Sequence, residues 1–409
     1  MSDANGGTAR DATGKVDVAV VGGGLAGLAA AAYLGRAGLR VTVLEKGHAV
    51  GGRATTRLKD GFAFNIGPHA LYRGGAGVGV LEELGVRWTG APPRTNGAAV
   101  LLGDGAEPFA VGPFAFLSSD LLPGGAKLEL ARVLWRLRGL DPRPLQGVTL
   151  RAWLDENTRH RRARAFLQAL FRVSCYAADT ERHSAGAAIA QLQRASRNVL
   201  YLDGGWQTLV DGLHRVAERA GVRIRANARV TALEPDGPGW LVRASGGDIH
   251  ALRVLLTGSP RIAAELVSGR SPSLQRFAQE AKPVRAATLD VALSRLPRPS
   301  PPVALGLERP LYFSVHSASA RLAPEGAAML HVAKYLDSGE SADGAEAELE
   351  RVLDRVQPGW REALVDRRFL PHPTVAHALV EARTGGTDGR PGVRVAEAPG
   401  LYLAGDWVG

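Results

Sequence analysis

The first alternation of hydrophobic and polar positions along the chain predicts a strand, a helix and a second strand in close succession. Residues 16–21 form a short β-branched apolar run, which is typical of a buried parallel strand. Residues 25–37 are rich in Ala and Leu and stop at Gly38, so they predict a helix with a glycine C-cap. Residues 40–44 again carry β-branched residues at alternate positions and end at Glu45. This βαβ unit predicts an α/β fold with a parallel sheet.

The pattern changes past about residue 90, where clusters of Pro, Gly and apolar residues indicate that the chain leaves its first domain. Two amphipathic helices are predicted at 128–137 and 163–176. The chain then returns to the first domain, with a strand predicted at 222–230 and a hairpin formed by 240–244 and 249–257. Further strands predict a second sheet, at 286–293, 303–307, 311–316 and 327–336.

We therefore expect two interleaved domains. One is a Rossmann-like α/β domain that binds a dinucleotide, and the other is an α+β substrate domain of a sheet plus helices. Residues 1–15 are polar and Gly-rich, without the apolar segment of a secretory signal, and are expected to be a disordered lead-in. The expected boundaries are 16–95, 200–265 and 385–409 for the nucleotide-binding domain, and 96–199 and 266–384 for the substrate domain.

Composition narrows the class of protein. Of the 409 residues 45% are hydrophobic, which is ordinary for a globular protein, and no apolar run is long enough to span a bilayer. Cys175 is the only cysteine, so we expect no intramolecular disulfide, no metal site and a cytoplasmic location. The net charge of +10 comes almost wholly from Arg. Because the sequence carries no nucleic-acid-binding module signature, nucleic acid is excluded as a partner.

The glycine-rich turn after the first strand indicates the chemistry. Gly22-Gly23-Gly24-Leu25-Ala26-Gly27 satisfies G-x-G-x-x-G. Gly22 allows the tight turn, Gly24 lets the backbone approach a pyrophosphate, and Gly27 lets the helix pack close to the strand. The amides and dipole of that helix favour phosphate. Glu45 lies near the spacing expected for an acid that accepts ribose hydrogen bonds, so the unit predicts a dinucleotide site.

Six residues after Glu45, the run Gly51-Gly52-Arg53-Ala54-Thr55 extends this motif. Here the sequence resembles the flavin amine oxidase, protoporphyrinogen oxidase and phytoene dehydrogenase superfamily, in which this loop passes beneath the FAD pyrophosphate. A guanidinium suits a diphosphate in geometry and charge, so the resemblance implies FAD rather than NAD. The FAD-binding residues implied are Gly22, Gly24, Leu25, Ala26, Gly27, Glu45, Lys46, Gly52, Arg53, Gly67, Pro68, His69, Val230, Gly405 and Asp406.

Residues 61–72 resemble a superfamily stretch that ends in Gly-Pro-His and runs near the flavin ring. Asn65 stands where the superfamily often has Asp. His69 is the one candidate catalytic residue. It either touches the isoalloxazine or the substrate, or is a satisfied polar residue at a strand-to-loop corner.

Two later segments complete the resemblance. Residues 203–234 are similar to a Gly-Gly-led helix and the strand after it, where the backbone of Val230 would flank the adenine. Residues 400–407 are similar to the last strand and its Gly-Asp pair, in which Asp406 would bind near the pyrophosphate and ribityl groups. A helix follows in the superfamily, whereas this sequence stops at Gly409. The resemblance leaves open whether the chain is cut short and still holds FAD.

A basic segment between the two predicted helices bears on membranes. In phytoene dehydrogenase-like enzymes a helical region of this kind helps the enzyme to meet a membrane that holds a lipophilic substrate. The other interpretation is a solvated Arg face, so peripheral contact with the inner membrane stays open. The cations are Arg151, Arg159, His160, Arg161, Arg162 and Arg164.

The resemblance is closest to bacterial phytoene dehydrogenase-like proteins, on residues 287–293 and 310–314. It implies an FAD-dependent oxidoreductase that passes a hydride from an apolar polyene or isoprenoid substrate to flavin N5. A flavin amine oxidase or protoporphyrinogen oxidase-type enzyme is the first alternative, and a non-catalytic prenyl- or lipid-binding module of the same fold is the second. The sequence does not decide the substrate, the oligomeric state, or whether oxygen or a quinone is the electron acceptor.

Overall fold

The computed structural model describes residues 15–109 and 121–409, which divide into two compact units. Unit 1 contains the described residues up to Gly52 together with Leu213–Gln279 and Gly392–Gly405, and unit 2 contains the remainder. The chain therefore passes from one unit to the other inside both the Gly-Gly-Arg and the Gly-Asp motifs. Residues 53–95 pack with unit 2, which differs from the expected domain boundaries. Packing does not test which stretches bind a dinucleotide, so those boundaries stay a prediction.

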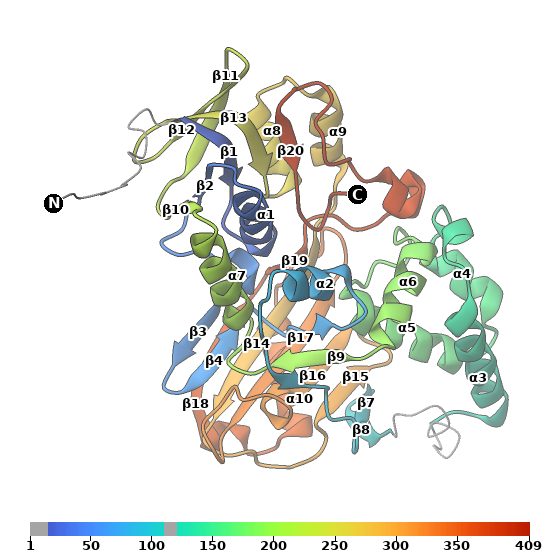
Figure 1. The fold of residues 1–409 in the computed structure, drawn as a ribbon. Coiled ribbons are helices and arrows are strands. Elements are labelled where there is room, and N and C mark those ends of the chain that lie inside the picture. The colour runs from blue at the N-terminus through green and yellow to red at the C-terminus, as the bar shows by residue number, and fades with distance from the viewer. Residues whose placement is uncertain (1–14, 110–120) are drawn as a thin grey trace. The chain divides into compact units, whose positions relative to one another are not determined.

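Unit 1 contains, within the described residues, a seven-stranded mixed sheet of order β10-β2-β1-β13-β12-β11, with β20 paired to β13 (Figure 1). β1 lies parallel between β2 and β13, and the residues of α1 that face the sheet, such as Leu28 and Ala31, are fully buried. The predicted α/β class is confirmed. The strands are β1 (Lys15–Val21), β2 (Val41–Leu44), β10 (Arg223–Arg225), β11 (Val230–Asp236), β12 (Gly239–Ala244), β13 (Ile249–Leu256) and β20 (Leu401–Leu403). The helices are α1 (Leu25–Arg36), α8 (Pro260–Val267) and α9 (Pro272–Glu280), while α7 (Gln207–Arg219) crosses from unit 2 into unit 1.

The strand predicted at 222–230 is wrong in its extent. It is divided into β10 and the start of β11, which lie at opposite edges of the unit 1 sheet. The break falls at Asn227, whose φ of 53° is left-handed and incompatible with a continuing strand. Asparagine tolerates this conformation better than most residues, which the apolar pattern alone did not reveal.

Unit 2 is built on an eight-stranded sheet, within the described residues, of order β18-β14-β17-β16-β15-β7-β8, with β19 paired to β14. Alternate residues point to opposite faces. One face, which includes Leu289, Phe313 and Val332, packs against α10 (Ala345–Val356) in an apolar core. The predicted second sheet is confirmed. Its strands are β7 (Ala99–Leu102), β8 (Gly105–Pro108), β14 (Val284–Leu293), β15 (Val303–Gly306), β16 (Leu311–Val315), β17 (Ala328–Leu336), β18 (Leu364–Leu370) and β19 (Thr374–Ala376).

The remaining helices of unit 2 include a cluster formed by α3, α4, α5 and α6 (Figure 1). This cluster has its own apolar core, which contains Trp153, Phe166 and Phe171. Both predicted amphipathic helices belong to it, as α3 and α5. The helices are α2 (Ala76–Glu83), α3 (Gly124–Gly139), α4 (Leu150–Asn157), α5 (Arg161–Cys175) and α6 (Ala185–Ala195). Short strands complete the unit: β3 (Thr56–Lys59), β4 (Phe62–Asn65), β5 (Leu71–Tyr72), β6 (Gly90–Ala91) and β9 (Val199–Leu202). The 3₁₀ turns are η1 (Gly52–Ala54), η3 (Arg143–Leu145), η4 (His316–Ala318), η5 (Trp360–Ala363), η6 (Ala382–Thr384) and η7 (Gly386–Gly389).

Candidate functional site

The glycine turn of unit 1 is shaped by what a side chain would meet at each position. Gly22 has a φ of 109°, and a Cβ there would collide with the hydroxyl of Thr257. A Cβ on Gly27 would overlap the carbonyl oxygen of Gly22, so only glycine lets the helix approach the strand so closely. Gly24 is different, because a Cβ there would have nothing within 4 Å. At Gly24, therefore, the space where a side chain would lie is open and is not filled by the protein's own atoms.

The helix that follows offers its first amides to that space. α1 begins at Leu25 with Gly24 as its N-cap, so no side chain caps it, and its first turn holds no acidic residue. The first amides of a helix lack intrahelical partners, and the helix dipole adds positive potential there. The open space at Gly24 and the uncapped amides together fit a pyrophosphate.

Glu45 shapes the same turn from the end of β2. Its Oε2 accepts from the Gly23 amide at 2.7 Å and its Oε1 accepts from the Gly47 amide at 2.7 Å. Each carboxylate oxygen keeps further acceptor capacity, which a ribose hydroxyl can use. The predicted Glu45 is thus placed beside the glycine turn, whereas Lys46 is exposed and Val230 is half-buried at the start of β11.

Arg53 and Asp406, predicted from opposite ends of the chain, bind each other in unit 2. The Arg53 guanidinium donates to both carboxylate oxygens of Asp406, at 3.0 and 3.1 Å, and to the carbonyl of Val375 at 2.7 Å. The His377 amide donates to Asp406 at 2.9 Å. Burial acts to raise the pKa of Asp406, but the hydrogen bond and charge of Arg53 hold it below its usual value. Asp406 is therefore a carboxylate, and Arg53 is a fixed cation beside it.

The Gly67–His69 turn lies directly on the unit 2 sheet. Gly67 has a φ of 75°, and a Cβ there would lie 3.0 Å from the Thr288 side chain of β14. The Asn65 side-chain oxygen accepts from the Thr56 hydroxyl at 2.7 Å and from the Trp206 amide at 3.1 Å. Asparagine thus supplies the same acceptor as the superfamily's aspartate would.

His69 carries its proton on Nδ1. That nitrogen is 3.0 Å from the carbonyl oxygen of Gly67, which can only accept, so in the neutral ring the lone pair lies on Nε2. The ring packs edge-on against Trp206, with centroids 5.0 Å apart. Burial lowers the pKa of His69, and the neighbouring His331 lowers it further. His69 is consequently a neutral acceptor at neutral pH.

A row of polar side chains, which we call the polar row, crosses four strands of the unit 2 sheet. Arg368, Asp290, His331 and Ser314 lie opposite one another on β18, β14, β17 and β16. Asp290 is fully buried and accepts from His331 Nδ1 at 2.6 Å and from the Arg368 guanidinium at 2.7 Å. Burial acts to raise the pKa of Asp290, yet the charges and hydrogen bonds of His331 and Arg368 hold it below its usual value. Arg368 also donates to the carbonyl of Asn65, which ties the row to the turn that carries His69.

His316 and two tyrosines extend the polar row. His316 Nδ1 lies 2.8 Å from the Ser314 hydroxyl, and its ring stacks on Tyr201 with centroids 3.7 Å apart. The Tyr201 and Tyr312 hydroxyls are 2.8 Å apart. Burial, followed by the charge of His331, lowers the pKa of His316 well below its usual value. His316 is therefore neutral.

Sequence reasoning missed the polar row. A signal was present, because Asp290 and His331 each interrupt a strongly apolar strand. Their pairing could not be predicted from the sequence, because the two residues are 41 positions apart and meet only through the register of their strands. Within residues 15–109 and 121–409, several buried polar side-chain atoms of unit 2 have no hydrogen-bond partner, whereas most buried polar atoms in proteins have one. They are Trp206 Nε1, Thr288 Oγ1, His316 Nε2, His331 Nε2, Tyr335 OH and Arg368 Nε.

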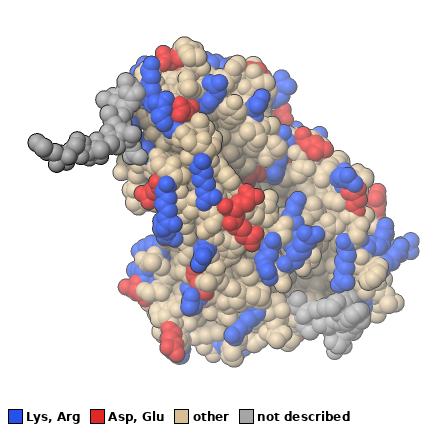
Figure 2. All heavy atoms as spheres, in the orientation of Figure 1, with Lys and Arg blue, Asp and Glu red and all other residues tan. Residues whose placement is uncertain are grey.

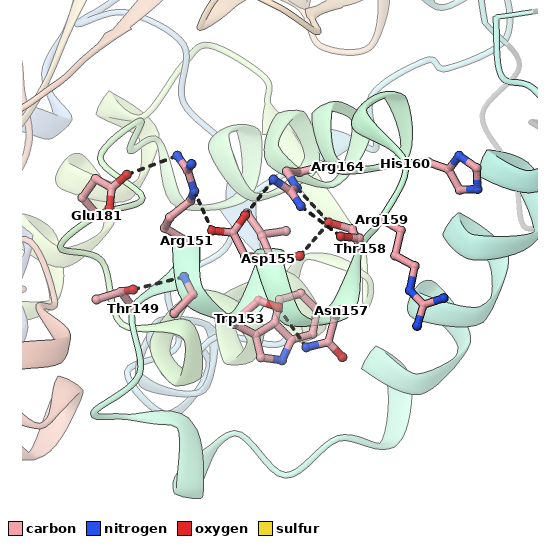
Figure 3. Close-up of polar contacts among 12 residues, drawn as sticks. Thr149, Arg151, Trp153, Asp155, Asn157, Thr158, Arg159, His160, Arg164 and Glu181 are labelled. Carbon is pink, nitrogen blue, oxygen red and sulfur yellow. Dashed lines mark hydrogen bonds and ion pairs between the residues drawn. The ribbon is translucent and has the colours of Figure 1, made fainter.

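The predicted basic segment separates into paired and outward side chains. Arg151 binds Asp155 and Glu181, and Arg164 binds Asp155 from the other side (Figure 3). Arg159 points away from this network in the same view. Arg162 donates to the carbonyl oxygen of Leu121, so three of the six predicted cations are bonded within the protein instead of forming a free basic surface.

Two kinds of feature are absent from the part of the chain that the structure describes. None of its helices is long and apolar enough to cross a membrane. It also holds no group of three His, Cys, Asp or Glu side chains arranged to bind a metal ion.

Comparison with known proteins places these features in a family. Residues 25–409 match the family described as flavin containing amine oxidoreductase. A 4,4'-diapophytoene desaturase of Staphylococcus haemolyticus is 28% identical over 301 residues, which cover 64% of this chain and 59% of the relative, so the chain spans about three fifths of that relative's length. Two solved structures share the fold over 96% of this chain. An oxidoreductase from Methanosarcina mazei has a TM-score of 0.78 at 20% identity over 95% of its chain, and a putrescine oxidase bound to putrescine has 0.71 at 18% over 93%. The resemblance read from the motifs is confirmed, and the chain belongs to the flavin containing amine oxidoreductase family, with FAD as its cofactor.

Proposed function

We propose that this protein is an FAD-dependent oxidoreductase that removes a hydride from an apolar substrate of the polyene or isoprenoid type. The observation that carries the proposal is the glycine turn, where Gly24 faces open space and α1 begins without a cap. A prenyl-binding module without flavin has no need for bare amides beside such an open position. The similarity to a diapophytoene desaturase supports the substrate class.

The residues that hold FAD follow from the chemistry of each position. We assign the pyrophosphate to Gly22, Gly24 and the first amides of α1, and the ribose to Glu45. Arg53 and Asp406 bind around the pyrophosphate and ribityl groups, with Gly52 and Gly405 leaving room for them. Lys46, Gly67, Pro68, His69 and Val230 complete the predicted set. When bound, FAD supplies a two-electron acceptor at N5.

His69 is the proposed proton-handling residue. Making a double bond by dehydrogenation releases a proton as well as a hydride, so a basic atom is required. The Nε2 of His69 is such an atom, because its tautomer is fixed by the Gly67 carbonyl. The polar row is joined to the turn that carries His69, because Arg368 donates a hydrogen bond to the carbonyl oxygen of Asn65.

One observation favours a second candidate function, oxidation of an amine or a porphyrinogen. The face of the unit 2 sheet beside His69 carries the unpartnered atoms of His316, His331 and Thr288, which suit a substrate with hydrogen-bonding groups better than a hydrocarbon. The fold shared with a putrescine oxidase is compatible with this candidate.

Flavin stoichiometry and substrate bleaching test these proposals. Purified protein is expected to carry, or to take up, one FAD with the absorbance of oxidised flavin. Under anaerobic conditions a polyene should bleach that absorbance, whereas putrescine or a porphyrinogen should not. Bleaching by the polar substrates alone would support the second candidate, and protein that never takes up FAD would support the prenyl-binding module. Reoxidation by oxygen or by a quinone then identifies the electron acceptor.

A further inference from the structure

Arg390 is a half-buried cation whose guanidinium group has no partner within residues 15–109 and 121–409. Most other cations lie on the surface, where Figure 2 shows blue side chains spread over the visible face and where water solvates them. The other described arginines that are not exposed all donate hydrogen bonds to carbonyl or carboxylate oxygens, as Arg172, Arg355 and Arg368 do. Withdrawing a guanidinium from water without such bonds costs free energy. Arg390 therefore lacks a compensating anion.

The backbone places Arg390 beside the last residues of unit 2. The carbonyl oxygen of Pro391 accepts from the Gly409 amide at 3.0 Å. A Cβ on Gly409 would lie 2.9 Å from the Cβ of Arg390, so the arginine side chain starts in contact with this segment. Residues 390–391 and 406–409 consequently lie side by side, and Arg390 is a neighbour of Asp406.

Asp406 does not serve as the missing anion. Its carboxylate oxygens already accept from the Arg53 guanidinium and from the His377 amide. The charge of Asp406 still acts on Arg390, while burial and the charge of exposed Arg194, in the last turn of α6, lower the pKa of Arg390. An arginine nevertheless stays protonated at neutral pH. The place therefore holds one neutral ion pair and an uncompensated cation.

The assigned cofactor has the opposite imbalance. The diphosphate of FAD is a dianion, and the cation assigned to it above is Arg53, whose charge is offset by Asp406. The amides of α1 contribute only the partial charges of a helix terminus. A full positive charge is thus missing for the diphosphate, and an anion is missing for Arg390.

We propose that Arg390 binds the diphosphate of FAD and supplies the charge that the Arg53–Asp406 pair does not. A guanidinium presents paired N–H donors that match two phosphate oxygens. An anionic group on the substrate would have the same chemistry, so the test has to separate these two sources. The inference rests on the assignment of FAD made above and does not depend on which substrate is oxidised.

Binding of FAD and of ADP tests the proposal without turnover. The full chain is freed of flavin and titrated with FAD by fluorescence, and ADP, which carries the diphosphate but no flavin, is measured by competition. Arg390→Gln should weaken the binding of both about tenfold. Arg390→Lys keeps the charge but loses the paired donors, and should weaken both about threefold. Rising salt should weaken FAD binding more in the wild type than in Arg390→Gln.

Arg355→Gln is the matched control, because Arg355 is also half-buried in unit 2 and donates to the Gly103 carbonyl at 2.9 Å. It should bind FAD and ADP normally but unfold at lower urea, since it loses a bond. Arg390→Gln loses no bond within the described residues and should unfold, without FAD, at the wild-type urea concentration or above it. A loss of stability in Arg390→Gln equal to that in Arg355→Gln would make Arg390 a structural residue and overturn the proposal.

The variant Gly24→Val separates failure of this inference from failure of the FAD assignment. Normal FAD and ADP binding by Arg390→Gln, with weak binding by Gly24→Val, would overturn this inference alone and assign Arg390 to an anionic group of the substrate. Normal binding by both variants would overturn the FAD assignment as well.

Discussion

The glycine turn of unit 1 and the polar row of unit 2 are built in opposite ways. The turn uses backbone atoms: its central Gly24 is the N-cap of α1, accepts from the Leu28 amide at 2.9 Å, and leaves open space where a side chain would lie. The polar row uses charged and polar side chains, and its central Asp290 is fully buried between a histidine and an arginine. A loop of bare amides suits a cofactor shared by many proteins, whereas a buried row of side chains can be specific to one reaction. The difference places the loop that suits a widely shared cofactor in unit 1, and the side chains that can be specific to one reaction in unit 2.

The largest effect is expected when the polar row is broken at its centre. Asp290→Ala leaves His331 and Arg368 without their carboxylate, and removing one partner of a buried ion pair costs about 3–5 kcal/mol. The measurement is the free energy of unfolding in urea. Asp366→Ala is the control, because it removes an ion pair to Lys59 at 2.7 Å in which the lysine is 40% exposed, and such pairs contribute about 0–1 kcal/mol. Equal losses in the two variants would show that the polar row has no special role in stability.

A substitution in the glycine turn should have the opposite effect: FAD binding is lost, while the protein stays folded. A Cβ at Gly24 would have nothing within 4 Å, so Gly24→Val should lower stability only by about 1 kcal/mol, through the poorer N-cap of α1. The same side chain would occupy the position assigned to the pyrophosphate, and FAD affinity should fall by about a hundredfold, or about 2.7 kcal/mol. FAD titration by fluorescence measures this loss. Gly77→Val, at another open position, is the control and should bind FAD normally. A large loss of stability in Gly24→Val would contradict the assignment of that space to a ligand.

The contrast also explains how much could be predicted from sequence. The glycine turn, Glu45 and the strands around them are local, so a motif of a few residues specifies them. Arg53 and Asp406 were each predicted from the resemblance, but the ion pair between them was not. The polar row depends on the register of four strands, and Arg368 lies 78 residues from Asp290 in the chain. The helices were predicted near their observed places, but the exposure of Trp135 depends on which side of α3 packs inward.

His69 is expected to affect turnover more than stability. A general base contributes about 10²–10⁴-fold, so His69→Gln should lower the rate of anaerobic flavin reduction about a hundredfold or more. Its ring is half-buried and outside the polar row, so unfolding should change little. FAD affinity should fall much less than in Gly24→Val, because the pyrophosphate and the ribose are assigned to other residues, and this difference separates the two variants. Unchanged reduction rates with bound FAD would leave His69 as a structural residue of the turn.

The smallest expected effect is a change in how stability depends on pH. The folded pKa of His316 lies well below its usual value, so the unfolded chain binds a proton that the folded chain does not. The ring faces His331, His69 and Tyr201, and Asp290 lies behind His331. Stability is therefore full above about pH 6.5 and falls as pH decreases from there toward the folded pKa, by about 1.4 kcal/mol per pH unit for one full proton.

His316→Asn should flatten this slope by about one proton while keeping a polar partner for Ser314. Unfolding free energies measured between about pH 5 and 7 test the change. Some slope should remain, because burial also lowers the pKa values of His69, His183 and His377. His372→Asn, at an exposed position, should keep the wild-type slope. Identical slopes in all three proteins would mean that His316 titrates alike in the folded and unfolded chains. The His316 ring would then be in contact with water, whereas the structure shows it buried.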